Sequence, residues 1–205
     1  KGHAKFALGI VTGDNKAHLS AEKLPGMEPV LKGGDIRRFG IGTPKNFIRF
    51  TPDAFQQVAP TAMYRAEEKL LYRFISEVPV FAYDDGRRLS LNSANILIPE
   101  IPGLRMKYVL AILNSSAAAF WLAKRVRSVK MLRSHLEALP IPVVPDEVQE
   151  QIVREVERIM SADRGEDVEA LYGALDAEVM RLYGLTDVEA ETIRTALRGK
   201  PSFLR

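Results

Sequence analysis

The hydrophobic pattern of this chain changes near residue 104, and that change constrains the fold more than any other feature. Between residues 70 and 98, three short runs rich in apolar residues are separated by turn residues such as Asp84-Asp85-Gly86; the runs are LLYRFI, VFAYDD and LSLNSANILI. Such runs are typical of strands, and we expect a β-meander. From Leu104 to Val126 apolar residues instead recur three and four positions apart, which indicates one or two helices with a break at Asn114-Ser115.

The last third of the chain continues the helical pattern. An amphipathic helix is expected over residues 145–160 with Asp146 as its N-cap, and a second over residues 167–183, closed by Gly184. A capping box that begins at Thr186 opens a third helix. The second helix carries an apolar stripe that needs a partner surface, either on its own domain or on another one: Leu171, Leu175, Val179 and Leu182.

The first fifty residues predict strands joined by polar turns. Residues 6–20 indicate a strand, an exposed loop around Gly13-Asp14-Asn15 and a second strand, and residues 46–50 alternate as a strand does. We therefore predict a mixed α/β (α+β) domain over residues 1–145, followed by a helical region over residues 146–205.

Charge divides the chain at the same place. Residues 1–145 carry 21 Lys and Arg against 12 Asp and Glu, a net charge of +9, whereas residues 146–205 carry 8 against 14, a net charge of −6. This asymmetry favours a polyanion as the partner of the first part. The chain has no cysteine and only three scattered histidines, which excludes disulfides and thiolate metal sites and predicts no bound metal. Its longest apolar stretch is too short to cross a bilayer, and we expect a cytoplasmic protein.

The most specific stretch is residues 136–159, LEALPIPVVPDEVQEQIVREVERI, in which a Leu-x-x-Leu-Pro-Ile-Pro turn and a further proline precede a helix. It resembles the end of target-recognition domains in type I specificity subunits and in type IIG restriction-modification enzymes. Other segments fit in the same order: GIVTGDNKAHLS, VLKGGDIRRF, LLYRFISEVPVFAYDD, YVLAILNSSAAAFWL and EVMRLYGLTDVE. Together they resemble a TaqI-like C-terminal specificity domain with its trailing helices, over nearly the whole chain.

The resemblance implies that the chain binds double-stranded DNA and is not itself an enzyme. It also implies a parent protein with a nuclease domain and an adenine methyltransferase domain, which would use Mg²⁺ and S-adenosylmethionine and would be the partners of this chain. The chain begins at Lys1 rather than at a methionine, so we expect a fragment of such a parent. The Asn-Pro-Pro-Tyr motif and the glycine-rich cofactor loop of these methyltransferases do not occur in it, and we expect no cofactor here.

Basic and amide side chains near the predicted turns are the candidate DNA contacts. A strip from Lys124 to Arg133 carries five positive charges without an acid, which would neutralise phosphates, or would form a solvated helix end. Arginine near a turn can bind guanine, and asparagine can bind adenine, although exposed charges and a simple hairpin turn explain these residues equally well. The candidates are Asn15, Lys16, Arg37, Arg38, Arg73, Arg87, Arg88, Arg125, Arg127, Lys130 and Arg133.

Two other functions stay open at this point. The basic face can instead dock on an acidic protein, which makes the chain a protein–protein interaction module. Pro52-Asp53 followed by Glu67-Glu68-Lys69 also matches the letters of a Mg²⁺ nuclease motif, although Asp53 is equally suited to opening a short helical turn.

Overall fold

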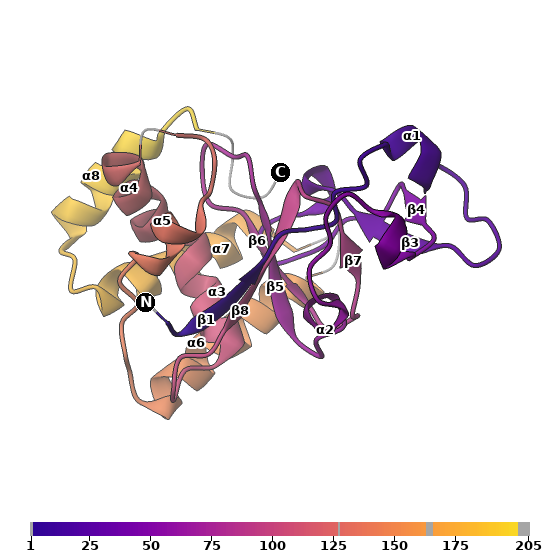
Figure 1. The fold of residues 1–205 in the computed structure, drawn as a ribbon. Helices are drawn as coiled ribbons and strands as arrows, with labels where there is room; N and C mark the ends of the chain where they lie inside the picture. The colour runs from indigo at the N-terminus through magenta and orange to yellow at the C-terminus, as the bar shows by residue number, and fades with distance from the viewer. Residues whose placement is uncertain (1, 127, 163–165, 201–205) are drawn as a thin grey trace.

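The computed structural model describes residues 2–126, 128–162 and 166–200, in which strands predominate before residue 100 and helices after it (Figure 1). The strands are β1 (Ala4–Ala7), β2 (Leu19–Ser20), β3 (Glu28–Leu31), β4 (Phe47–Ile48), β5 (Lys69–Arg73), β6 (Phe81–Asp84), β7 (Leu89–Ser90) and β8 (Ala94–Pro99). The helices are α1 (Asn15–His18), α2 (Thr61–Tyr64), α3 (Met106–Asn114), α4 (Ser116–Arg125), α5 (Arg133–Glu137), α6 (Asp146–Ser161), α7 (Val168–Leu182) and α8 (Asp187–Leu197), with 3₁₀ turns η1 (Gly33–Asp35) and η2 (Pro52–Ala54). The predicted mixed α/β architecture with a helical C-terminal region is confirmed.

A central antiparallel sheet with the order β1-β8-β5-β6 lies between two hydrophobic layers. Side chains alternate along β5, so that Leu70 and Tyr72 face the helices whereas Leu71 faces the second sheet. Both faces of the sheet are therefore buried, which explains why its strands read as nearly continuous apolar runs rather than as a polar and apolar alternation.

The second sheet has the order β2-β4-β3-β7, with β7 parallel to β3. The predicted meander is wrong, because β8 pairs with β5 and not with β6. The outer edge of β6 is occupied instead by Phe39, whose backbone N–H donates to the carbonyl of Phe81 at 2.8 Å. After β6 the chain crosses to the second sheet as β7 before it returns to the first as β8.

Helices α3 and α4 are separated at Ser115, as the sequence predicts. The Ser115 hydroxyl accepts a hydrogen bond from the backbone N–H of Ala118 at 3.1 Å, which caps α4. Every residue of α3 from Tyr108 to Asn114 is buried, because the helix lies between the central sheet and the C-terminal helices. In the described residues no single helix is long and apolar enough to span a membrane, although α3 and α4, bent by 59°, satisfy that test together.

The C-terminal helices complete the core on the helical side. Asp146 is not the N-cap of α6, because Pro145 holds that position and the Asp146 carboxylate instead pairs with Arg105 at 2.6 Å. The apolar stripe of α7 packs on its own chain, since Leu175 and Val179 are buried in the core that contains α3. The capping box at the start of α8 is confirmed, as is the positive φ of Gly184, which is 70°.

Two large hydrophobic cores result, one on each side of the central sheet. The first lies between the sheet and helices α3, α6 and α7, and the second lies between the two sheets. A small third cluster joins α4 to α8. The first core includes Leu110 and Ile112 together with Ile152 and Val179, so it spans both sides of residue 145.

Candidate nucleic-acid interface

Strand pairing brings several loops together at one end of the central sheet. The end of β5 lies opposite the start of β8, where Arg73 is paired with Ala94, and the end of β1 lies beside the same start. Turn η1 follows β3 at this end as well, because the backbone N–H of Gly33 donates to Ser93 Oγ at 2.9 Å. The loops after β1, β3 and β5 and before β8 therefore converge.

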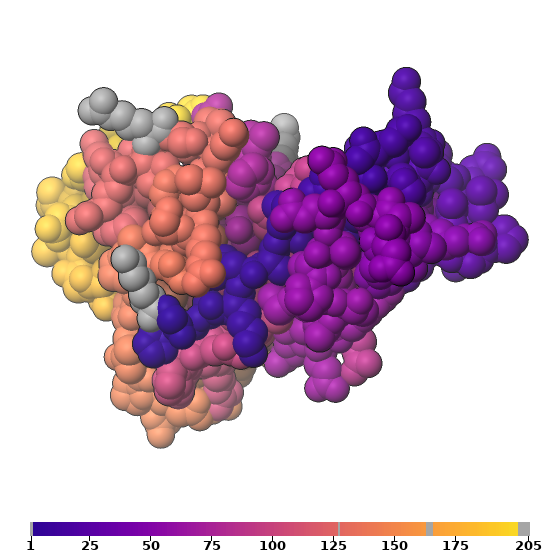
Figure 2. All heavy atoms as spheres, viewed as in Figure 1, coloured from indigo at the N-terminus to yellow at the C-terminus, as the bar shows by residue number. Residues whose placement is uncertain are grey.

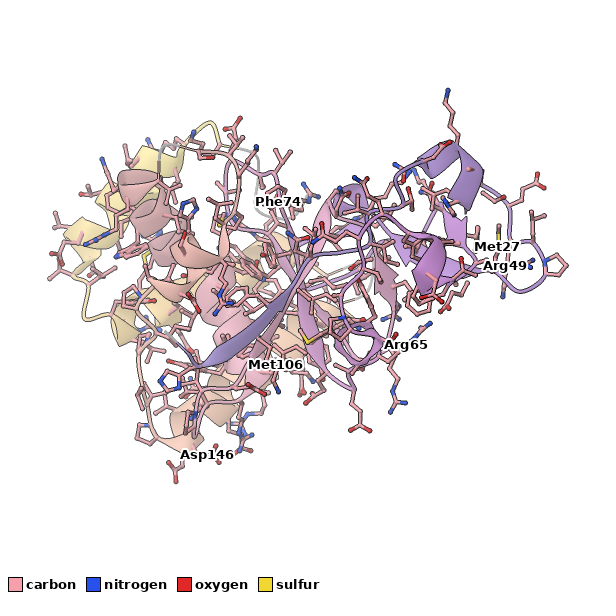
Figure 3. The ribbon with its side chains drawn as sticks, viewed as in Figure 1. Met27, Arg49, Arg65, Phe74, Met106 and Asp146 are labelled. Atoms are coloured by element: carbon pink, nitrogen blue, oxygen red, sulfur yellow. The ribbon has the colours of Figure 1, made fainter. Side chains whose placement is uncertain are left out.

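Strand β5 continues past Arg73 into a short antiparallel ribbon, formed by residues 74–76 and residues 129–131, at this end of the sheet. Ile75 and Lys130 are paired in it, and backbone hydrogen bonds of 2.7 and 2.9 Å flank the pair. Figure 3 labels Phe74 at the upper end of the central sheet, between the helices and the part of the molecule that carries α1. We call these residues the ribbon. It places the segment that follows α4 beside the converging loops.

Positive charge surrounds this end of the sheet. The end of α4 packs beside the ribbon, because Leu122 and Val126 line one small cavity with Ser76 and Lys130. In Figure 2 the surface dips along its upper edge between the part that carries α4 and the part that carries α1. We call the cationic side chains carried by the converging loops, the ribbon, α1 and the end of α4 the basic end: Lys16, Arg37, Arg73, Lys124, Arg125 and Lys130.

Few carboxylates offset this charge in the described residues. Glu77 lies 3.4 Å from the ammonium of Lys200. The carboxylate of Asp14 caps α1, and that of Asp35 accepts a hydrogen bond from the backbone N–H of Lys32 at 2.8 Å. Each of these acids is thus engaged with a group other than the cations of the basic end.

The opposite end of the central sheet is acidic. Exposed carboxylates gather there, namely Glu67, Glu68, Asp85 and Glu100. Arg87 pairs with Glu67 at 3.0 Å, and Arg88 binds the carboxylate of the buried Asp84. Two of the candidate DNA contacts, Arg87 and Arg88, are therefore separated from the others by the length of the sheet. We call this the acidic end.

Residues 28–141, more than half of the chain, match the family described as TaqI-like C-terminal specificity domain. This chain belongs to that family. No curated protein sequence matches it. Among solved structures, the type IIL restriction-modification enzyme MmeI in complex with DNA aligns with a TM-score of 0.65 and 11% identity, over 95% of this chain and 36% of that one. A type I restriction-modification assembly aligns with a TM-score of 0.56 and 20% identity, over 96% of this chain and 44% of that one. The specificity domain thus spans less than half of either of these chains.

One candidate of this specificity domain is not exposed. Arg38 is 5% exposed, and its Nε donates to the carbonyl of Pro79 at 3.2 Å while its guanidinium lies 5.7 Å from the ring centre of Tyr172. Burial lowers the pKa of Arg38 to about 10, although the nearby Tyr172 and Asp176 oppose the shift. The prediction that Arg38 is exposed is wrong, because the adjacent Phe39 packs in the core and Arg38 is buried beside it.

The remaining candidates differ in how firmly they are held. Arg73 is half-buried, and its Nε donates a hydrogen bond to the backbone carbonyl of Ile36 at 2.8 Å. This bond restrains the Arg73 side chain. Arg125 is exposed and lies over the ring of Trp121 at 4.7 Å. Arg133 stacks on the ring of Phe6 at 5.3 Å and pairs with Glu137 at 2.9 Å. Arg127 lies outside the described residues.

The loop before α1 is not a hairpin, because β1 and β2 belong to different sheets. Asp14 caps the single turn of α1, and the side-chain oxygen of Asn15 accepts a hydrogen bond from Thr12 Oγ1 at 2.8 Å. This leaves the amide nitrogen of Asn15 and the ammonium of Lys16 exposed on the far side of the dip from α4. Both residues are placed by the cap rather than by strand pairing.

Sequence reasoning missed two amide side chains at the basic end. Asn92 is exposed, and its backbone N–H donates to the carbonyl of Ile10 at 3.1 Å. Gln57 is also exposed and pairs with Val11 through two backbone hydrogen bonds of 2.9 and 3.0 Å. Amide side chains can bind adenine through two hydrogen bonds. The sequence predicts a strand run over LSLNSANILI, and only the fold shows a turn at Asn92-Ser93 beside η1.

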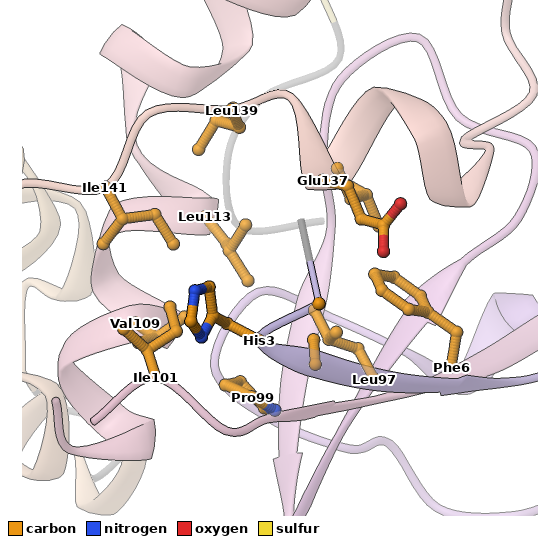
Figure 4. Close-up of a pocket in the computed structure, with 13 residues that line it drawn as sticks. His3, Phe6, Leu97, Pro99, Ile101, Val109, Leu113, Glu137, Leu139 and Ile141 are labelled. Carbon is orange, nitrogen blue, oxygen red and sulfur yellow. The ribbon is translucent and has the colours of Figure 1, made fainter.

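One apolar hollow lies away from the basic end. Figure 4 shows this hollow, of about 190 Å³, between β1, α3 and the segment around Leu139, in which only His3 and Glu137 contribute polar side chains. Glu137 is already bound by Arg133. This lining suits an apolar group and offers few partners for a phosphate or a base.

The nuclease motif does not assemble. Asp53 lies in η2, as its helical interpretation predicts, whereas Lys69 is fully buried with its ammonium 2.6 Å from Asp84. A lysine held in this way cannot position an attacking water beside Mg²⁺. In the described residues, no three His, Asp or Glu side chains lie close enough together to hold a metal ion.

Proposed function

We propose that this chain recognises duplex DNA through the basic end of its central sheet, as the target-recognition part of a larger restriction-modification protein. The observation that carries the proposal is the separation of charge along the sheet. At one end five of the six cations are exposed and Arg73 is half-buried, and at the other end Arg87 and Arg88 are bound to carboxylates. Phosphate contacts from such cations supply affinity for DNA, and side chains that reach the base edges supply sequence specificity.

The comparisons support this proposal through two kinds of likeness. Family membership assigns the chain a specificity role, and MmeI, whose fold it shares, is described in complex with DNA. Docking on an acidic protein explains the exposed charge less well, because it gives no reason for exposed amides at Asn92 and Gln57 beside the cations. Duplex DNA presents both phosphates and base edges, which suits both kinds of side chain.

The parent protein would supply the chemistry. We propose that it contains an adenine methyltransferase domain with S-adenosylmethionine and a nuclease domain with Mg²⁺, and that the acidic helices of residues 146–205 brace the basic domain against them. We assign no step of methyl transfer to this chain, because its residues include neither the adenine-binding motif nor the cofactor loop. Its own part is to bind DNA and to orient it.

The first experiment measures salt-dependent DNA binding. A fluorescent duplex of random sequence is titrated with the wild-type chain and with a variant in which Lys124, Arg125 and Lys130 are alanine. Each lost phosphate contact reduces the slope of log K against log salt by about 0.9, so the slope is expected to shrink by about 2 to 3. These side chains are exposed, and the variant is expected to fold normally.

A charge-matched control separates this surface from total charge. In it Lys5, Arg87 and Arg154 are alanine; each is exposed and pairs with a carboxylate in the structure. The control is expected to keep nearly the wild-type slope. Equal slopes for the two variants would contradict the proposal, since they would show that net charge and not the basic end determines binding.

A further inference from the structure

The tip of the ribbon exposes an apolar side chain among cations. Ile75 is 62% exposed, although isoleucine is among the residues most often buried. Val129, on the other strand of the ribbon, is 49% exposed, and Leu132 beyond it is 42% exposed. Three exposed apolar side chains therefore lie where the proposed function places DNA.

Ile75 shares one side of the ribbon with positive charge. It lies directly opposite Lys130 in an antiparallel pair, and residues in such a pair project to the same side. Arg73 lies two positions earlier in the chain, at the end of β5, and its Nε donates to the carbonyl of Ile36. The result is an exposed apolar side chain beside an ammonium.

This arrangement matches a chemical feature of the major groove. A two-stranded ribbon fits that groove, and the 5-methyl group of thymine is the one apolar group that the base edges present there. The lysine opposite Ile75 would contact a phosphate or guanine. We propose that Ile75 is a specificity-determining residue that contacts a thymine methyl group, so that this chain prefers an A·T pair at one position of its DNA site.

Docking on another protein domain is the competing explanation for an exposed isoleucine. An interface core that buries Ile75 would also have to desolvate the ammonium of Lys130, and lysine is depleted from such cores. The rim of a groove in DNA keeps that charge beside phosphates. The position of Ile75 opposite Lys130 therefore favours DNA, and the inference rests on the proposed function.

The test begins with selection from a library of random duplexes by the wild-type chain and by Ile75→Ala. The wild type is expected to enrich a site that contains a preferred thymine, and Ile75→Ala is expected to keep the remaining positions while losing that preference. The selected duplex is then synthesised with deoxyuridine at the preferred thymine, which removes only the methyl group. Binding by the wild type is expected to weaken about fourfold, the effect of one buried methyl, and binding by Ile75→Ala is expected not to change.

Val188→Ala provides the matched control, because Val188 is 77% exposed but lies on α8. This variant is expected to select the wild-type site and to discriminate against deoxyuridine as the wild type does. If Ile75→Ala keeps both the thymine preference and the deoxyuridine effect, the inference is wrong and the proposed function stands. If the wild type binds no duplex at low salt, the proposed function fails first, and the inference fails with it.

Discussion

The two ends of the central sheet hold arginine and lysine in opposite ways. At the acidic end Lys69, Arg87 and Arg88 all pair with carboxylates, one of which, Asp84, is completely buried. At the basic end Lys16, Lys130 and others face solvent. A cation that is paired with a carboxylate contributes to the stability of the fold, by an amount that is close to zero where the pair is exposed. A cation that is left in solvent remains able to bind an anion. The same residue types therefore have different functions at the two ends.

Removal of the buried carboxylate at the acidic end is expected to have the largest effect. Asp84→Ala leaves the ammonium of Lys69 buried without its partner, which costs about 3–5 kcal/mol in unfolding free energy. Denaturant unfolding measures this change. The exposed pair at the same end is the control, since Arg87→Ala is expected to cost less than about 1 kcal/mol. A similar loss of unfolding free energy in the two variants would contradict the distinction between buried and exposed ion pairs.

A substitution of Arg38, the neighbour of Arg37 in the basic end, tests whether a buried cation contributes to folding. Because its guanidinium is buried and bonded to Pro79, Arg38→Ala is expected to lower the unfolding free energy by about 2–3 kcal/mol through lost hydrogen bonds and packing. The same unfolding assay measures it. A neutral outcome would show that Arg38 is held less firmly than its contacts indicate.

Acid titration is expected to distinguish two buried carboxylates by the sign of their effects. Burial alone would raise the pKa of Asp84, but hydrogen bonds and charges from Lys69 and Arg88 hold it below 3.8, so its stabilisation is lost as the pH falls through that lowered pKa. Burial raises the pKa of Asp176, so the folded state binds this proton more tightly and gains stability as the pH falls through the raised pKa toward the ordinary aspartate value of about 4.

Unfolding curves across pH 3–7 check both signs. Asp176→Asn is expected to flatten the rise on the acid side of neutrality, and the wild type is expected to lose stability once the pH is below about 4, near the ordinary pKa of an aspartate. Stability that falls steadily from pH 7 in the wild type, with no difference in Asp176→Asn, would contradict the assignment.

The smallest effect on folding is expected at Arg37, the exposed neighbour of Arg38. Arg37→Ala should change the unfolding free energy by no more than about 0.5 kcal/mol. For DNA binding by Arg37→Ala, the slope of log K against log salt should nevertheless be smaller by about 0.9, which is the contribution of one phosphate contact. An unchanged slope would exclude Arg37 from the interface.

Much of the local structure could be predicted from the sequence. The break at Ser115, the capping box at Thr186 and the closure of α7 at Gly184 each depend on residues only a few positions apart, and all three are confirmed. The motif of residues 136–159 also indicated the family before any fold was known. Local hydrogen bonding and periodicity carry this information, because the partners are neighbours in the chain.

Only the tertiary structure decided which cations stand together. Arg37 and Arg38 are adjacent in sequence, yet one is exposed and the other is buried against Tyr172, which lies in a helix far along the chain. Arg87 and Arg73 are equivalent by sequence but lie at opposite ends of one sheet, since antiparallel pairing reverses direction at each strand. Charge and residue type are properties of the sequence, whereas exposure and neighbourhood depend on contacts between distant segments.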